Sequence, residues 1–156
     1  DGGRVVGEGA LADVMARLDL PTARGDGAGV VLSAVVAAHD TPWQLARLDV
    51  GEGFSVWARD SGLPVGQRVR VRLLARDVSL AREPQVATSI GNQLRGVVEA
   101  LADDEHPSQA LVRVRVGEGG AASPVVARLT RRSAHALGLQ PGLPVWVQVK
   151  TVAVVE

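Results

Sequence analysis

The chain of 156 residues contains no cysteine, no tyrosine, one phenylalanine and one lysine. Without cysteine the protein can form neither disulfide bonds nor thiolate metal sites. The lack of disulfides makes a cytoplasmic setting the expected one. Aromatic residues account for 3% of the chain, so the core has to be built from valine, leucine and alanine. Valine-rich runs favour strands, because β-branched side chains suit a pleated, half-buried surface.

An excess of positive or negative charge is also missing, because 17 basic residues are balanced by 17 acidic residues. No section of the chain is strongly basic, which disfavours a nucleic-acid groove. No apolar run approaches the roughly 20 residues of a membrane span, and no basic-then-apolar signal opens the chain. We therefore predict no nucleic-acid partner and no direct membrane insertion. Three scattered histidines form no metal-ligand pattern, and we expect no metal site.

Motifs for catalysis are lacking as well. No phosphate-binding loop of the form G-x-x-x-x-G-K-[ST] occurs, and no nucleophile and base stand in a suggestive pattern. We expect no enzymatic activity from this chain as given. The acidic run 103–105 falls in a predicted hairpin turn and is interpreted as solvated charge. Tryptophans occur in alternating segments and are expected in the core or at an interface: Trp43, Trp57 and Trp146.

An internal repeat organises most of the chain. The residues Val50-Gly51-Glu52-Gly53 recur letter for letter at 116–119, with the same order of strands and turns around them. This indicates a duplication of about 60 residues. Each copy has five short strands and one brief helical turn, the content of a small OB-like barrel. The sequence therefore predicts a mainly β protein with two tandem OB-like subdomains, at residues 29–85 and 86–156.

The first 25 residues differ from the repeats. Turn residues and a short apolar strand at 1–6 suggest a hairpin, and apolar residues at helical spacing predict a short helix over 10–18. The polar, glycine-rich residues that follow are typical of a linker. This segment has too little partner surface to be stable alone. We interpret residues 1–25 as the end of a preceding domain plus a linker.

Residues 88–96 form a donor-rich loop that opens into an apolar run. Thr88, Ser89 and Asn92 supply side-chain donors, and Gly91 exposes its backbone N–H. A buried tetrahedral dianion requires many donors, and a charge-assisted hydrogen bond contributes about 1.5–3 kcal/mol. The loop is either half of an oxyanion-binding site or a simple connector. The only lysine, Lys150, could supply a compact cation for a small anion, or could be a survivor of codon bias.

The motifs at 74–81 and 88–96 resemble the C-terminal region of the ATPase subunit of molybdate-importing ABC transporters. The second repeat is similar to a Mop, or TOBE, domain, an OB-like unit that binds molybdate and tungstate. Residues 1–9 resemble the closing hairpin of an ABC ATPase domain. The resemblance implies a regulatory and dimerisation domain of a molybdate or tungstate importer, which senses the intracellular oxyanion and inhibits transport.

The resemblance also implies site residues. In Mop proteins a Ser-x-Arg-Asn loop of one unit meets a Lys-Ser/Thr segment of another, and the matching positions are Ser89, Asn92, Lys150 and Thr151. Thr88 and Gly91 complete the candidate set. The family pattern has arginine at the position of Gly91, so Lys150 would be the main neutralising charge. The first repeat lacks the loop and carries leucine where the second has lysine, which predicts a structural role for it.

The implied partners are a second copy of the chain, the parent ATPase domain and, through it, the transporter's membrane subunit at the inner face of the membrane. The implied ligand is molybdate or tungstate, with no further cofactor. Two other functions remain open. One is a purely structural OB-like dimerisation module that has lost oxyanion binding. The other is an OB-type nucleic-acid binder, which neutral charge and few aromatic residues disfavour.

Overall fold

The computed structural model describes residues 29–51, 53–117 and 122–155. The hairpin, helix and linker predicted for residues 1–25 lie outside this part. Strands dominate the described residues, and they form two sheets with five strands each. The prediction of a mainly β protein with two small OB-like units is confirmed. Among the described residues no helix is long and apolar enough to cross a membrane.

The first sheet has the strand order β10-β4-β1-β2-β3. Its strands are β1 (Gly29–Asp40), β2 (Leu45–Val50), β3 (Phe54–Arg59), β4 (Arg68–Leu74) and β10 (Ala153–Val155). The second sheet has the order β5-β9-β6-β7-β8. Its strands are β5 (Val78–Ala81), β6 (Asn92–Asp103), β7 (Gln109–Val116), β8 (Ser123–Thr130) and β9 (Pro144–Val149). Short helices complete the structure: η2 (Thr41–Trp43), η3 (Ala75–Asp77) and α2 (Arg131–Leu137).

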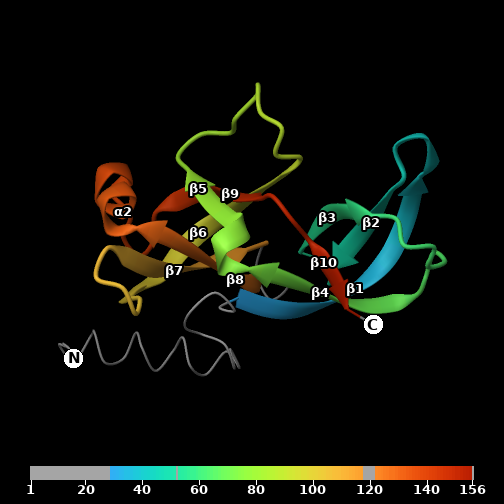
Figure 1. Cartoon of the computed structure of the whole chain (residues 1–156), viewed down its shortest axis with the longest axis horizontal. Coiled ribbons are helices and arrows are strands. Elements are labelled where there is room, and N and C mark those ends of the chain that lie inside the picture. Colours follow the sequence, from blue (N-terminus) through green and yellow to red (C-terminus); the bar gives the residue numbers. More distant parts are fainter. Residues whose placement is uncertain (1–28, 52, 118–121, 156) are drawn as a thin grey trace.

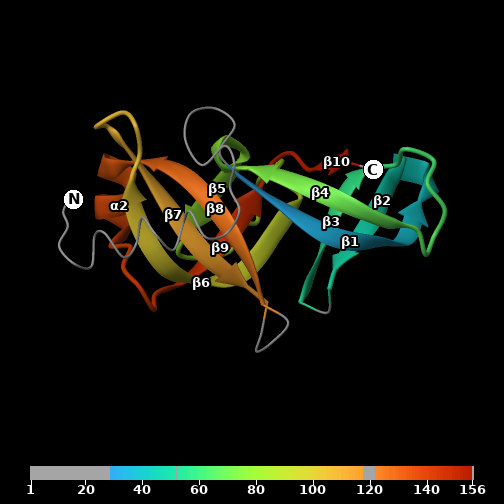
Figure 2. The same cartoon turned by 90° about the horizontal axis from the view of Figure 1, so that it is seen from below.

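The two sheets exchange their fifth strands. After β4 the chain crosses through η3 into β5, which pairs with β9 of the second sheet. After β9 it crosses back into β10, which pairs with β4 of the first sheet. Figure 1 shows this return as the red segment that runs from β9 to β10, and Figure 2 shows β10 beside β4. The expected boundary between residues 85 and 86 therefore does not divide the sheets.

The duplication is visible in the backbone. The register shifts just after Val36 in β1 and just after Val98 in β6, which places a bulge at the same point of each long strand. In the first copy the N–H of Gly66 donates to the carbonyl of Val36 at 2.8 Å, and in the second Gly142 donates to Val98 at 2.8 Å. Both glycines have positive φ. A turn that needs glycine thus closes on the bulge in each copy.

Side chains from both sheets contribute to one core cluster. Its largest fully buried members are all valine or leucine, as the composition predicts. Gly96 lies where β6 crosses closest to its neighbours. A Cβ added there would lie 2.6 Å from Val114 Cγ1 and 3.0 Å from the Arg115 carbonyl oxygen. The centre of the second sheet therefore has room for glycine alone at this position.

Helix α2 begins and ends with the expected capping residues. Thr130 has an extended backbone, and its hydroxyl oxygen accepts a hydrogen bond from the N–H of Ser133 at 3.0 Å. Gly138 follows the helix with a φ of 68°. Threonine satisfies a free N–H of the first turn, and glycine adopts the left-handed conformation that ends a helix. Thr130 is therefore the N-cap of α2.

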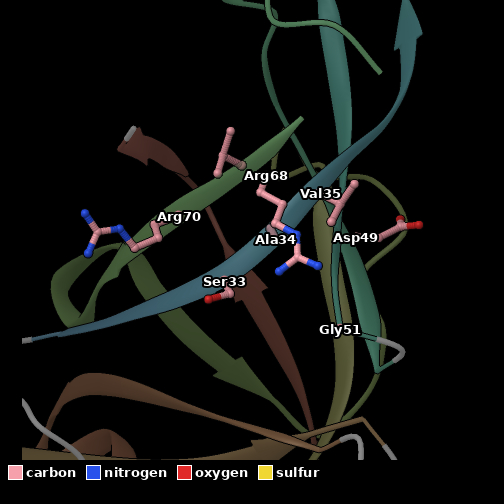
Figure 3. Close-up of a pocket in the computed structure, with 8 residues that line it drawn as sticks. Ser33, Ala34, Val35, Asp49, Gly51, Arg68 and Arg70 are labelled. Atoms are coloured by element: carbon pink, nitrogen blue, oxygen red, sulfur yellow. The ribbon is translucent and has the colours of Figure 1, made fainter. Parts of the chain in front are cut away.

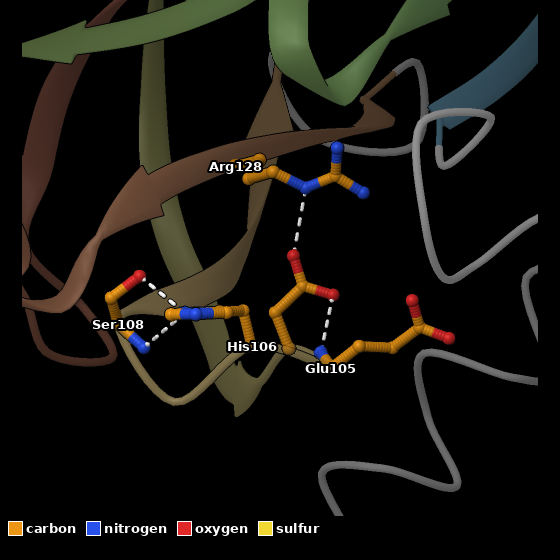
Figure 4. Close-up of polar contacts among 5 residues, drawn as sticks. Glu105, His106, Ser108 and Arg128 are labelled. Atoms are coloured by element: carbon orange, nitrogen blue, oxygen red, sulfur yellow. Dashed lines mark hydrogen bonds and ion pairs between the residues drawn. The ribbon is translucent and has the colours of Figure 1, made fainter.

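In the acidic turn after β6, Asp103 and Glu105 are exposed, as expected for solvated charge, but that interpretation is wrong for Asp104. The Asp104 carboxylate accepts a hydrogen bond from Arg128 Nε at 2.7 Å, and only 3% of the Asp104 side chain is exposed. Its other oxygen accepts from the N–H of Glu105 at 2.7 Å. Figure 4 shows Arg128 of β8 and the turn residues Glu105, His106 and Ser108, with their hydrogen bonds and ion pair drawn as dashed lines. The ion pair anchors the turn to β8.

Two of the three tryptophans lie on the surface. Trp43 is 76% exposed and Trp57 is 37% exposed, so neither belongs to the core. Trp146 on β9 is half-buried, and the guanidinium carbon of Arg95 lies 5.8 Å from its ring centroid. Of the two expected settings, core or interface, the core is thus wrong for Trp43 and Trp57, and an interface stays a prediction. Both lie in the first copy, at its outer surface.

Candidate functional site

The β6–β9 ladder brings the two halves of the predicted site together. The ladder ends with Asn92 opposite Val149. Gly91 and Lys150 are the next residues on the two strands, so the end of the loop and the lysine segment lie side by side. The resemblance implied two halves from different units. In this structure both halves belong to one chain and meet at the end of the second sheet, where the chain crosses to β10 (Figure 1).

The backbone of Lys150 is hydrogen-bonded, whereas its side chain has no partner among the described residues. Its N–H donates to the carbonyl oxygen of Asp77 in η3 at 3.0 Å. This bond fixes the point at which the chain leaves β9. The side chain is exposed, and within the described part of the chain no residue accepts a hydrogen bond from the ammonium group or pairs with it. Thr151 follows and is exposed as well.

The loop half of the site is open to solvent. Thr88, Ser89 and Gly91 are all exposed. The hydroxyl oxygen of Thr88 accepts a hydrogen bond from the N–H of Ile90 at 3.2 Å. This bond leaves the hydroxyl proton of Thr88 available for a ligand. The three residues thus present donors without a fixed acceptor.

Gly91 has space around it and an ordinary backbone. No heavy atom lies within 4 Å of the position that its Cβ would take, and its φ lies outside the left-handed region. Neither sterics nor backbone strain therefore requires glycine here. The arginine of the family pattern is absent, although the local structure has room for one. The charge of the candidate site is lower as a result.

Asn92 does not face solvent with the rest of the loop. It is 7% exposed, and its side chain makes two hydrogen bonds to the backbone of Trp57 on β3. Oδ1 accepts from the Trp57 N–H at 2.8 Å, and Nδ2 donates to the Trp57 carbonyl at 3.0 Å. One N–H of the amide remains for a ligand. The sequence could not reveal this partner, which lies 35 residues away in the other sheet.

The candidate site is a set of hydrogen-bond donors. It contains one ammonium group, several hydroxyls, one amide proton and the backbone at Gly91. Such donors can bind a tetrahedral anion through charge-assisted hydrogen bonds. The arrangement is absent from the first copy, where β4 ends at Leu74 and an apolar side chain takes the place of Lys150. Of the described residues, no group of histidine, cysteine and acidic side chains could hold a metal ion.

The candidate residues lie in a part of the chain that matches a known family. Residues 88–155 match the family model of the TOBE domain. That range contains β6 to β10 and all six candidate residues. It includes β10, which completes the other sheet. The matched family unit therefore extends across both sheets of this structure.

Proteins that match nearly the whole of this chain are ATP-binding proteins of molybdenum import. The chain is 58% identical over 154 residues to the molybdenum import ATP-binding protein ModC of Methylococcus capsulatus, covering 99% of this chain and 42% of that protein. It is 54% identical over 153 residues to the protein of the same name from Thiobacillus denitrificans, covering 98% of this chain and 41% of that protein. The chain thus spans less than half the length of these relatives.

A solved structure shares the fold. The cytoplasmic molybdate-binding protein ModG, solved with molybdate bound, aligns with a TM-score of 0.64 at 20% identity. The alignment covers 80% of this chain and 94% of that one. At this identity the similarity establishes the arrangement of the strands only. Taken together, residues 88–155 match the TOBE domain family, and nearly the whole chain is similar to part of the molybdenum import ATP-binding proteins.

Proposed function

We propose that this chain is the regulatory and dimerisation domain of the ATPase of a molybdate or tungstate importer. It binds the oxyanion between the loop that ends at Asn92 and the segment Lys150-Thr151. The observation that carries the proposal is the β6–β9 ladder, whose last pair sets Gly91 beside Lys150. The only lysine of the chain thus lies against the donor-rich loop, with a side chain that no described residue neutralises.

The open side of the site supports a role for a second copy. A dianion held by one ammonium group and a few hydroxyls would keep much of its charge uncompensated. Residues 82–89 and Gly91 are exposed, and Val86, just before the loop, is 95% exposed. We propose that a second chain covers this loop, adds donors and removes the anion from water. Dimerisation and ligand binding would then stabilise each other.

The segment that connects β9 to β10 offers a link between oxyanion binding and regulation of the ATPase domain. Lys150 and Thr151 lie between β9 of one sheet and β10 of the other. A ligand that holds this segment favours one arrangement of the two sheets, in proportion to its differential affinity for that arrangement. We propose that this arrangement keeps the ATPase domain of the parent protein at rest. The domain would act at the inner face of the membrane, through the transporter's membrane subunit.

Titration calorimetry of the 156-residue chain with molybdate and with tungstate tests the proposal. We expect saturable binding of at least one oxyanion, and its loss in Lys150→Gln. Arg132→Gln on α2 removes an equally exposed charge away from the site and should leave binding within about twofold. Sedimentation with and without ligand checks the dimer. No heat from either oxyanion at millimolar concentration contradicts the proposal.

A purely structural dimerisation module is the second candidate. Two observations favour it: Gly91 has no charge, and the amide of Asn92 already holds the Trp57 backbone. This candidate predicts a dimer without ligand and no shift of the unfolding temperature with any oxyanion. The same sedimentation and calorimetry experiments distinguish the two candidates.

A further inference from the structure

The outer face of the first sheet carries a row of arginines. Strand β4 alternates exposed arginines with buried apolar residues. Its neighbour β1 presents smaller exposed side chains in register: Val35 lies opposite Arg68, Ser33 opposite Arg70 and Val31 opposite Arg72. We call this surface the arginine face, made of Arg68, Arg70, Arg72, Val31, Ser33 and Val35.

The cations of the arginine face have no described counter-ion. Within the described residues no acidic side chain forms an ion pair with Arg68, Arg70 or Arg72. Asp49 on β2 borders the face, opposite Val35. Its carboxylate is already engaged by Arg47 Nε at 3.3 Å and by the hydroxyl of Ser55 at 2.7 Å. Three positive charges therefore point to solvent on one surface of a chain whose net charge is zero.

The second copy satisfies the same face internally. There Arg95 lies over the ring of Trp146. Glu99 pairs with Arg113 at 2.9 Å and with Arg115 at 3.4 Å. Two copies of one fold have thus diverged on the same surface. In the second copy Arg95 contacts a ring, and Arg113 and Arg115 contact an acid, whereas Arg68, Arg70 and Arg72 of the first copy have no such partner among the described residues.

The shape of the arginine face fits a chain better than a single small anion. A cavity of about 600 Å³ lies over it, lined by Ser33, Arg68, Arg70 and Asp49 among others. Figure 3 shows the Arg68 guanidinium over β1, whereas the Arg70 guanidinium extends away from β1. The two groups do not converge on one point. Separate anions along an extended ligand match this arrangement.

We propose that the arginine face binds an acidic segment of a partner protein. Alternate residues of a strand are about 7 Å apart, so an extended peptide with carboxylates at alternate positions can match the arginine row. Guanidinium forks recognise carboxylates in a bidentate geometry. Val31 and Val35, which are 50% and 38% exposed, supply apolar contact between the charges. Arginine interleaved with apolar area is typical of protein interfaces.

Two other occupants fit the surface less well. A second copy docked face to face would bring arginine row against arginine row, and like charges repel. A planar bilayer does not follow the concavity over Ser33 and Arg68. The partner therefore carries the negative charge itself, on a segment narrow enough to enter the concavity.

The test uses the 156-residue chain and a fluorescent ten-residue peptide in which glutamate alternates with threonine. We expect fluorescence anisotropy to show binding that weakens as salt is added. The triple variant Arg68→Gln, Arg70→Gln, Arg72→Gln should lower the affinity at least about tenfold. A matched triple variant, Arg76→Gln, Arg131→Gln, Arg132→Gln, removes the same amount of charge elsewhere. It should change the affinity for the peptide by less than about twofold.

A second measurement keeps the test independent of whether the variants fold. Amide resonances of β1 and β4 in the unmodified chain should shift on addition of the peptide, and those of α2 should not. An isomeric peptide with its glutamates in one block should bind more weakly than the alternating one. Equal losses of peptide affinity in the two triple variants would overturn the proposal, since binding would then depend on net charge alone. Binding of phosphatidylserine vesicles without binding of the peptide would overturn it in favour of a membrane.

Discussion

The carboxamide of Asn92 on β6 holds the backbone of Trp57 on β3 through two hydrogen bonds, at 2.8 and 3.0 Å. Strand β3 is the edge of the first sheet, and an edge presents unpaired N–H and C=O groups. An amide side chain has the donor and acceptor of a peptide group, so Asn92 substitutes for one residue of a neighbouring strand. The bond pair joins the two sheets at the candidate site.

Replacing Asn92 by alanine should destabilise the fold by about 1–3 kcal/mol, because the Trp57 backbone loses both partners in a part-buried position. The chain offers a matched control in Gln93. Its amide makes the same two bonds to the backbone of Gln85, at 2.9 and 2.7 Å, but at an exposed position. Gln93→Ala should cost less than about 0.5 kcal/mol. Urea unfolding measures both, and equal losses would contradict a special role for Asn92.

Gly91→Arg should strengthen oxyanion binding. The site has no atom within 4 Å of the new Cβ, so the side chain can be added without strain. A guanidinium brings a positive charge and paired donors, and about tenfold tighter binding is expected for one charge-assisted hydrogen bond. Calorimetry with molybdate and tungstate gives the change. Gly91→Gln is the control for size without charge. No gain in Gly91→Arg would argue that the anion does not reach this loop.

Removing the carboxylate of Asp104 should unfold the acidic turn more readily than any exposed acid would. Breaking a buried pair costs about 3–5 kcal/mol, and the Asp104 and Arg128 side chains are 3% and 8% exposed. Asp104→Ala is therefore predicted to be strongly destabilising. The half-exposed pair of Arg115 and Glu99 serves as control, and Arg115→Gln should cost less than about 1 kcal/mol. Thermal unfolding of both variants tests the difference, which added salt should barely change.

Gly96→Ala should destabilise the second sheet by about 1–3 kcal/mol through overpacking. The added methyl group would meet Val114 Cγ1 at 2.6 Å and the Arg115 backbone at 3.0 Å, and the backbone contact cannot yield by a rotamer change. Gly91→Ala at the open loop position is the control, and there reduced freedom of the unfolded chain should give no loss. A Gly96→Ala protein as stable as the unmodified one would show that β6 and β7 can separate slightly.

The duplication and the core could be predicted from the sequence because both follow from local residue patterns. Repeated turn residues, such as Gly51 and Gly117, mark matching turns, and both have positive φ in the structure. Alternation along 68–74 indicates a strand with one wet face, and β4 has that pattern of burial. Period-two patterns report which face of a strand is buried, since successive side chains point to opposite faces.

Three features were not accessible in this way. The pattern of Asp104 is that of any turn acid, and its burial depends on Arg128 from another strand. Trp43 has the sequence pattern of a core or interface residue, and only the assembled structure shows that 76% of it is exposed. Asn92 looks like a ligand donor, and only its distance to Trp57 shows the second role. Each depends on how segments distant in sequence pack together.

The sequence by itself determined that this protein is a duplicated, valine-rich β structure with a donor-rich loop and a single lysine in its second copy. The tertiary structure decided which strand completes which sheet. Strands β5 and β10 are short and apolar, and their residues would suit the edge of either sheet. The crossings after β4 and β9 send each to the opposite sheet, so Lys150 lies at a crossing, and the register of β6 and β9 sets it beside Gly91. Periodicity specifies a face of a strand, whereas the partner of an edge strand is settled only when the whole core assembles.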